Sequence, residues 1–313
     1  MNRLQVKLPG IVLKNPIMPA SGCFGYGESF AKHYDLGVLG AVVIKSTTLE
    51  ERLGNPAPQY VHRDDTVLNS VGLKNPGINT VLSEKLPFLA NYDVPVIASV
   101  AGSKEEDYIE MCQRISQAEN VSAIELNVSC PNVKEGGIAF GTDLQVVKQL
   151  TQQCKAVTHL PIYVKLTPNV TDIVSVAKAA EEGGADAITM INTITAMAFN
   201  LESRQPILGG VTGGLSGTSL KHIALRMIYQ VTGAVKIPII GVGGIKTVDD
   251  VLEMYMAGAS AVQIGTENYN QPMICPEIIS QLPHRMDELG IESLETLIDE
   301  VSIARYHDGH SLA

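Results

Sequence analysis

The sequence predicts an α/β protein: a (β/α)8 (TIM) barrel forming a single domain over residues 1–313, with extended loops at the C-terminal ends of its strands. Three observations predict this fold. Eight short apolar segments recur along the chain, with helical patterns between them. Most of these segments are nearly continuous in Val, Ile and Ala, as parallel strands buried on both faces are. Two connections are long, and long loops in compact domains are usually functional.

The eight expected strands span residues 15–20, 41–45, 95–100, 123–128, 161–166, 187–191, 238–242 and 261–265. Eight strands alternating with helices favour a closed barrel over an open doubly wound sheet. The long connections, 46–77 and 192–216, each follow the C-terminal end of a strand. Barrel enzymes hold their active sites at that end.

Helix-start and helix-stop signals lie between the strands. Thr247 is followed three residues later by Asp250, close to a capping box, and Ser103 with Glu106 forms the full motif. Gly258 follows a helical stripe, as a C-terminal cap does. These signals divide the chain into repeated strand–helix units.

Composition narrows the class of protein. Hydrophobic residues make up 45% of the chain, charged residues 18%, and the net charge is −10. An acidic chain of this kind argues against nucleic-acid binding. Five cysteines without a C-x-x-C pair suggest neither a disulfide framework nor a metal or iron–sulfur site. With neither a signal peptide nor a membrane span in the sequence, we expect a cytoplasmic protein.

Glycines lie at the C-terminal ends of the last two expected strands. Gly243-Gly244 and Gly265-Thr266 stand where such barrels often hold a phosphate on backbone N–H groups. Glycine lets the backbone approach an anion, and the following helix adds a favourable dipole. A tight turn would explain either pair alone. Together they predict a phosphate-bearing ligand.

Two lysines, Lys45 and Lys165, close otherwise apolar strands. A lysine is almost never fully buried unpaired, although one at a strand end can extend to solvent. Two such lysines at one barrel mouth favour contact with anionic ligand groups. A reduced flavin ring and a carboxylate are both candidates.

Asparagines accompany the lysines, at Asn69, Asn127, Asn132 and Asn192. Each amide offers two donors and an acceptor, which matches a small planar substrate with amide and imide edges. Asn69 and Asn132 lie in loops, where turn formation is the alternative explanation. Glu125 shares strand parity with Asn127, and so is expected inside the barrel at a deeper level.

Cys130 follows the fourth strand, beside these asparagines. Cysteine is often a small buried hydrophobe, which suits Cys112 and Cys154 on helix core faces. The position of Cys130 at the mouth favours a chemical role instead. Cys23, after the first strand, is the weaker candidate.

Four motifs together resemble class 1 dihydroorotate dehydrogenases. They are PASG at 19–22, NSVGLKNPG at 69–77, ELNVSCPN at 125–132 and GVGGI at 241–245. The similarity covers essentially the whole chain in motif order, and the second and third motifs are highly specific. Such enzymes are barrels that bind FMN, use cysteine as the base and oxidise (S)-dihydroorotate to orotate in UMP biosynthesis.

The resemblance implies one FMN per chain and assigns residues to it. The implied flavin contacts are Ser21, Lys45, Ser46, Ser99, Asn127, Lys165, Ile191, Gly217, Gly243, Gly244, Gly265 and Thr266. The implied substrate contacts are Lys45, Asn69, Ser70, Val71, Gly72, Leu73, Asn127, Asn132, Asn192 and Thr193. Cys130 is the implied catalytic base.

The subclass is carried by NVKEGGIAFG at 132–141 and GGLSG at 213–217, which resemble class 1B. In that class, a homodimer of catalytic chains assembles with a second kind of subunit, which carries FAD and a 2Fe–2S cluster. The resulting heterotetramer passes electrons to NAD+. The Lys45-Ser46 pair is closer to class 1A, which uses fumarate. A barrel of the dihydropyrimidine dehydrogenase type and a non-catalytic phosphate-binding barrel remain alternatives.

Overall fold

The structure, a computed structural model, describes residues 2–63, 65–128 and 140–298. Eight parallel strands form one sheet: β3 (Ile17–Pro19), β4 (Val42–Val43), β7 (Val96–Val100), β8 (Val121–Asn127), β9 (Ile162–Lys165), β10 (Ala187–Met190), β15 (Ile239–Val242) and β16 (Ala261–Ile264). From β4 to β16 each strand pairs with the next barrel strand along the chain, and β16 pairs with β3, which leaves β3 and β4 as the two ends of the sheet. At the seam between β3 and β4, the Gly40 N–H donates to the Ile17 carbonyl at 2.9 Å. The predicted (β/α)8 barrel is confirmed.

Each of the eight strands overlaps its predicted segment. Nearly every strand residue is buried, because one face packs inside the barrel and the other against helices. This two-sided burial explains why the segments are continuously apolar rather than alternating.

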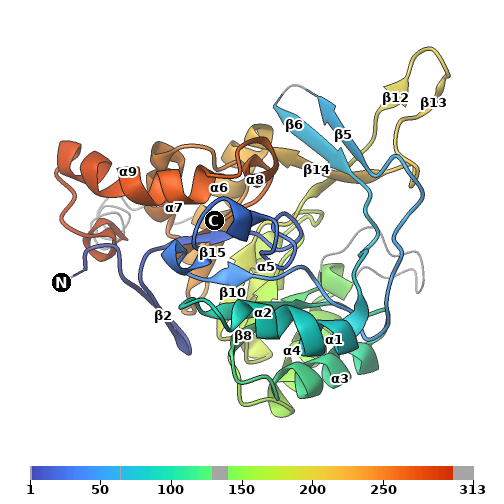
Figure 1. Cartoon of the computed structure of the whole chain (residues 1–313), viewed down its shortest axis with the longest axis horizontal. Coiled ribbons are helices and arrows are strands. Elements are labelled where there is room, and N and C mark those ends of the chain that lie inside the picture. Colours follow the sequence, from blue (N-terminus) through green and yellow to red (C-terminus); the bar gives the residue numbers. More distant parts are fainter. Residues whose placement is uncertain (1, 64, 129–139, 299–313) are drawn as a thin grey trace.

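Helices surround the barrel (Figure 1). The α-helices and the π-helical turn η3 are α1 (Gly77–Thr80), η3 (Val81–Lys85), α2 (Leu86–Leu89), α3 (Glu105–Ile115), α4 (Leu144–Ala156), α5 (Ile173–Glu182), α6 (Lys221–Thr232), α7 (Val248–Ala257), α8 (Glu267–Asn270) and α9 (Ile274–Glu288). The 3-10 turns are η1 (Phe30–Lys32), η2 (Leu36–Val38), η4 (Phe140–Thr142) and η5 (Thr218–Leu220). Within the described ranges, no helix is long and apolar enough to cross a bilayer.

The helix-start signals have mixed outcomes. Thr247 Oγ1 accepts the Asp250 N–H at 3.2 Å and Asp250 accepts the Thr247 N–H at 2.7 Å, so this capping box is confirmed. The box predicted from Ser103 and Glu106 is wrong. Asp107 accepts the Ser103 N–H at 2.8 Å, because α3 begins later than the pattern suggested.

The two long connections pair with each other. Residues 46–77 contribute β5 (Tyr60–Arg63) and β6 (Thr66–Asn69), and residues 192–216 contribute most of β11 (Ile194–Ala196) and β14 (Gly213–Gly217). These strands form an antiparallel sheet in the order β11-β14-β6-β5. A hairpin of β12 (Phe199–Asn200) and β13 (Gln205–Pro206) extends from it, away from the barrel (Figure 1).

An N-terminal hairpin, which the sequence pattern did not predict, closes the other end of the barrel. Its strands are β1 (Val6–Leu8) and β2 (Ile11–Leu13). Their buried side chains form one apolar cluster with inward residues of the barrel strands. The Tyr163 hydroxyl donates to the Pro9 carbonyl at 2.7 Å, which ties the hairpin turn to β9.

Candidate active site

A cavity opens at the C-terminal ends of the barrel strands, beside the second sheet. Its empty volume is about 1260 Å³, part of it open to solvent. The predicted site residues that line it are Ser21, Lys45, Ser46, Asn69, Val71, Gly72, Leu73, Asn127, Lys165, Ile191, Asn192, Thr193, Gly217, Gly243, Gly244, Gly265 and Thr266. Side chains from all parts of the chain therefore meet in one place.

Two predicted site residues lie behind the cavity wall instead. Ser99 is fully buried and reaches the cavity through Ser46, with 2.8 Å between the two hydroxyl oxygens. Ser70 is also fully buried, and its hydroxyl accepts from Asn55 Nδ2 at 3.0 Å. Cys130 and Asn132 lie outside the described residues.

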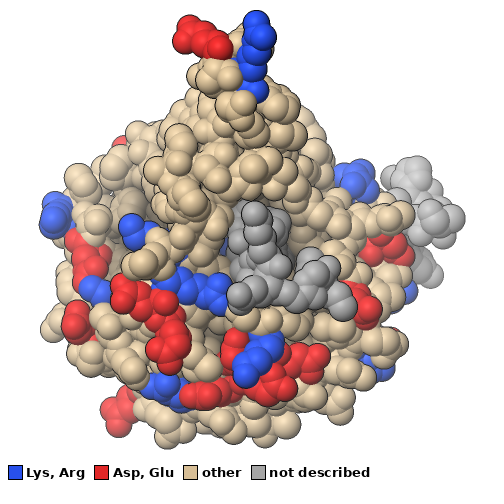
Figure 2. Space-filling model, turned by 90° about the vertical axis from the view of Figure 1, so that its right-hand side faces the viewer, with Lys and Arg blue, Asp and Glu red and all other residues tan. Residues whose placement is uncertain are grey.

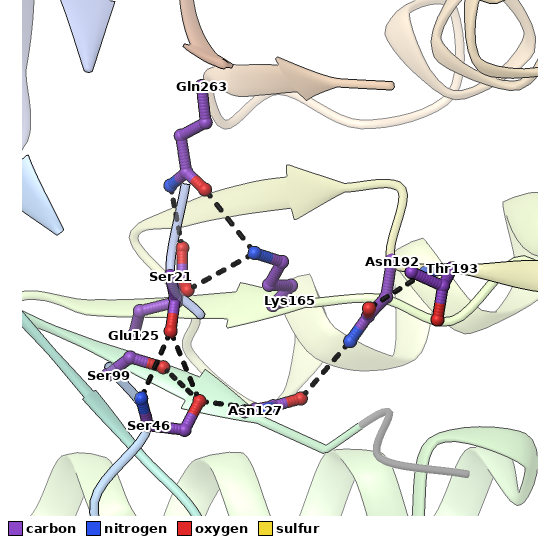
Figure 3. Close-up of polar contacts among 9 residues, drawn as sticks. All are labelled: Ser21, Ser46, Ser99, Glu125, Asn127, Lys165, Asn192, Thr193 and Gln263. Atoms are coloured by element: carbon purple, nitrogen blue, oxygen red, sulfur yellow. Dashed lines mark hydrogen bonds and ion pairs between the residues drawn. The ribbon is translucent and has the colours of Figure 1, made fainter. Parts of the chain in front are cut away.

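A chain of hydroxyls and amides runs along one wall (Figure 3). Ser46 Oγ accepts from Asn127 Nδ2 at 2.9 Å, and Asn127 Oδ1 accepts from Asn192 Nδ2 at 3.3 Å. Asn192 Oδ1 in turn accepts the Thr193 N–H at 2.7 Å. Each amide is held in one orientation, so the wall presents fixed donors and acceptors.

The floor carries a buried ammonium group. Lys165 ends β9, and only 6% of its side chain is exposed. Its Nζ lies 3.4 Å from Gln263 Oε1 and 3.7 Å from Glu125 Oε1. Glu125 is fully buried inside the barrel, as its strand parity predicted. Lys45 reaches the same cavity from the end of β4.

The glycine loops fit a phosphate group. A β-carbon at Gly265 would meet nothing closer than 3.7 Å, so open space faces that backbone. Helix α6 begins beside Gly244 with neither a capping side chain nor an acidic residue in its first turn. The Lys221 N–H already donates to the Thr218 carbonyl, so the positive end of the helix dipole, rather than this N–H, would favour an anion here. The residue before α6, Leu220, lines the cavity.

Two tyrosines at the cavity were missed by the sequence reasoning. Tyr60 and Tyr269 meet edge to face, with ring centroids 5.8 Å apart, and the Tyr269 hydroxyl donates to the Gly22 carbonyl at 2.7 Å. Tyr60 belongs to the long connection that was expected to carry function. No periodic pattern singled out either residue.

Cys23 lines the cavity within the described residues. Burial raises the pKa of its thiol, with smaller opposing effects from Lys165, Tyr269 and Lys45. Cys23 is therefore protonated near neutral pH and poorly suited to act as a base. Cys112 and Cys154 are buried in the core, as expected.

Comparison with known proteins agrees with this geometry. The family model for dihydroorotate dehydrogenase matches residues 3–286. Barrel, cavity and family match together define the class: the chain belongs to the dihydroorotate dehydrogenase family.

Individual relatives are more specific. A protein of Enterococcus faecalis (strain ATCC 47077 / OG1RF) is 59% identical over 301 residues, 96% of either chain. One from Listeria welshimeri is 56% identical over 300 residues, 96% of this chain and 99% of the relative. One from Anoxybacillus flavithermus is 58% identical over 294 residues, 94% of either chain. All three are named dihydroorotate dehydrogenase B (NAD(+)), catalytic subunit.

Proposed function

We propose that this chain, folded as one domain, is the catalytic subunit of an NAD-linked dihydroorotate dehydrogenase. It oxidises (S)-dihydroorotate to orotate in UMP biosynthesis. One observation carries the proposal: a single cavity joins a glycine-lined anion site to a wall of amides and a buried ammonium. Relatives of 55–59% identity carry the corresponding name, which supports it.

The residues present fit FMN. Gly217, Gly243, Gly244, Gly265 and Thr266, together with the uncapped start of α6, would hold the phosphate. The ring would lie against the strand ends, on Ser21, Lys45, Ser46, Asn127, Lys165 and Ile191, with Ser99 fixing Ser46. When bound, FMN supplies the hydride acceptor, and the protein positions and tunes it.

The substrate would lie between this floor and the second sheet. Its ring and carboxylate would contact Lys45, Asn69, Val71, Gly72, Leu73, Asn127, Asn132, Asn192 and Thr193, with Ser70 behind them in the wall. The ordered amides of Asn127 and Asn192 match a ring that alternates donors and acceptors. Asn69 is held by donation from its Nδ2 to the Gly214 carbonyl at 3.2 Å.

Cys130 would remove the proton from C5 of dihydroorotate while the hydride leaves from C6. A positioned base of this kind typically contributes ~10²–10⁴-fold to the rate. The ordered amides of Asn127 and Asn192 would hold the substrate ring in one orientation, so that C5 faces the base and C6 faces the hydride acceptor. Such orientation lowers the activation barrier, because the reacting groups lose their translational and rotational freedom on binding and not in the transition state.

The test of this function is the visible spectrum of the purified protein. We expect a yellow protein whose flavin absorbance is bleached under anaerobic conditions by dihydroorotate but not by dihydrouracil. Bleaching by dihydrouracil instead would indicate an enzyme of the dihydropyrimidine dehydrogenase type. A colourless protein that cannot be reconstituted with FMN would contradict the proposal.

Electrons would pass from the chain to NAD+ through a second subunit carrying FAD and a 2Fe–2S cluster. The words "catalytic subunit" in the names of the relatives support a separate partner. Two catalytic chains would form the centre of a heterotetramer. The projecting β12–β13 region is a candidate contact surface for one of these partner chains. Its exposed apolar side chains include Met197, Phe199 and Leu201, and Figure 2 shows few charged residues there except at its tip.

A further inference from the structure

A buried polar triad joins the cavity floor to the layer beneath it: Lys165 on β9 in the floor, and Glu125 on β8 and Gln263 on β16 below (Figure 3). Gln263 Nε2 donates to Glu125 Oε2 at 2.8 Å, and Gln263 Oε1 accepts from Lys165 Nζ at 3.4 Å. The ion pair between Lys165 Nζ and Glu125 Oε1 spans 3.7 Å. Gln263 therefore bridges the two charged groups.

The carboxylate is poorly compensated for so deep a position. Glu125 has no exposed surface, and its Oε1 accepts no hydrogen bond among the described residues. Thr189, which pairs with Lys165 in the sheet register, likewise has a buried hydroxyl without a partner there. A buried ion pair is weak evidence for stability, since apolar residues of similar volume often stabilise a protein as well. The fold alone does not account for Glu125.

Position relates the triad to the ligand site. Lys165 lines the cavity, whereas Glu125 and Gln263 do not. Two residues further along their strands, Asn127 and Gly265 do line it. Inward-facing residues alternate along a strand, so Glu125 and Gln263 lie one layer below the floor. Their charge and dipole act on a ligand from behind Lys165.

We propose that Glu125 is a positioning residue that, through Gln263, holds the Lys165 ammonium at the cavity floor and sets the electron affinity of the bound FMN ring. This inference rests on the proposed function. Charges interact strongly in a buried, low-dielectric site, and charge near a flavin ring tunes its electronics. The carboxylate offsets part of the positive field of Lys165 and so makes the flavin harder to reduce.

The test is the midpoint potential of FMN in the holoprotein, measured by equilibration with a reference dye and without dihydroorotate. Glu125→Gln removes the charge and keeps the shape. We expect this variant to raise the ratio of reduced to oxidised FMN at a fixed potential by about tenfold. For a two-electron couple, this corresponds to a midpoint potential higher by ~30 mV. Lys165→Met should shift the ratio the other way. Glu182→Gln, at a surface pair with Lys148, is the matched control and should leave it unchanged.

A charge exchange separates electrostatics from folding. Glu125→Gln combined with Gln263→Glu moves the carboxylate to the neighbouring position, still beside the same ammonium. We expect a ratio within twofold of the parent, because one negative charge beside Lys165 is restored.

Three outcomes decide the inference. An unchanged or lowered potential in Glu125→Gln overturns it. If Glu125→Gln does not fold, the double variant with Glu125→Gln and Gln263→Glu is used instead. A ratio of reduced to oxidised FMN in that variant that differs more than twofold from the parent overturns the inference. Failure of every chain, the parent included, to bind FMN refutes the proposed function instead.

Discussion

At the scale of single residues, Gly265 has room for a side chain and Gly244 has none. A β-carbon at Gly244 would lie 2.7 Å from the Lys221 nitrogen, and its φ of +72° disfavours other residues. At Gly265 the nearest atom would be Cys23 Sγ, at an ordinary 3.7 Å. The fold itself therefore requires Gly244, whereas the backbone at Gly265 faces open space.

Gly265→Val should fold and lose FMN. The added methyl groups would occupy cavity space, so we expect the FMN dissociation constant to rise at least ~10-fold, or ~1.4 kcal/mol. Quenching of FMN fluorescence on titration with apoprotein measures it. Gly233→Val is the control, because a β-carbon there meets nothing within 4 Å. Parent-like affinity in Gly265→Val would place the phosphate elsewhere.

Cys130→Ala should keep the flavin and bind orotate nearly as before, yet be reduced slowly. Loss of a positioned base should slow single-turnover bleaching by dihydroorotate by ~10²–10⁴-fold. Cys130→Ser should retain part of the rate, since a hydroxyl is a poorer base near neutrality. Stopped-flow reduction across pH measures all three proteins. A parent-like Cys130→Ala beside a slow Cys23→Ala would transfer the role to Cys23.

Much of the cavity lining could be predicted because polar residues end apolar strands. Lys165 and Asn127 stand out in that way. Gln263 does not, because it lies within an apolar strand and its partner Glu125 is 138 residues away. Contacts between distant segments leave no local pattern, which is also why Tyr60 and Tyr269 were missed.

At the scale of elements, α7 begins directly after the glycine loop, and Asp250 fixes its start. Its carboxylate accepts the N–H groups of Lys246 at 2.9 Å and Thr247 at 2.7 Å, and the Lys221 ammonium at 2.7 Å. Burial alone would raise the pKa of Asp250, but these hydrogen bonds together hold it below its ordinary value. The cap thus links the starts of α6 and α7 beside the cavity.

Asp250→Asn should destabilise the protein at neutral pH by about 1–2 kcal/mol, because it loses charge-assisted hydrogen bonds. A folded-state pKa below the unfolded value stabilises the protein above the unfolded pKa of ~3.9, and the effect is lost as pH falls through the folded pKa. The difference in unfolding free energy between parent and variant should therefore shrink in acid. Denaturant titrations at pH 7 and near pH 3 measure this.

The control for that experiment is Asp249→Asn. Asp249 lies in the same first turn of α7 but forms an exposed pair with Arg285. Exposed pairs contribute ~0–1 kcal/mol, so its effect should be smaller. An Asp250→Asn difference that stays constant with pH would contradict the charge-based account.

Strands were easier to predict than their surroundings. Two-sided burial makes a barrel strand continuously apolar, so all eight were found. The β1–β2 hairpin was missed because its strands have three residues each and bury only alternate side chains. The second sheet was expected only as long loops, since its pairing of β6 with β14 joins segments about 145 residues apart.

At the scale of the whole molecule, the isolated chain should reduce artificial dyes but hardly any NAD+. The sequence holds neither a cysteine cluster for an iron–sulfur centre nor a G-x-G-x-x-G fingerprint for a dinucleotide. Steady-state assays with dihydroorotate and each acceptor measure this. Rapid NAD+ reduction by the chain alone would remove the need for a partner, and efficient turnover with fumarate would indicate class 1A.

The N-terminal hairpin also bears on how reactants come and go. Together with the inward side chains of the strands it completes a packed core below the cavity, so orotate should leave through the same opening that admits dihydroorotate. On the proposed function, product and substrate would compete for one space in the cavity, and each turnover would wait for exchange there. Orotate should therefore inhibit competitively against dihydroorotate. As orotate accumulates, the steady-state rate should fall before flavin reduction itself becomes slow.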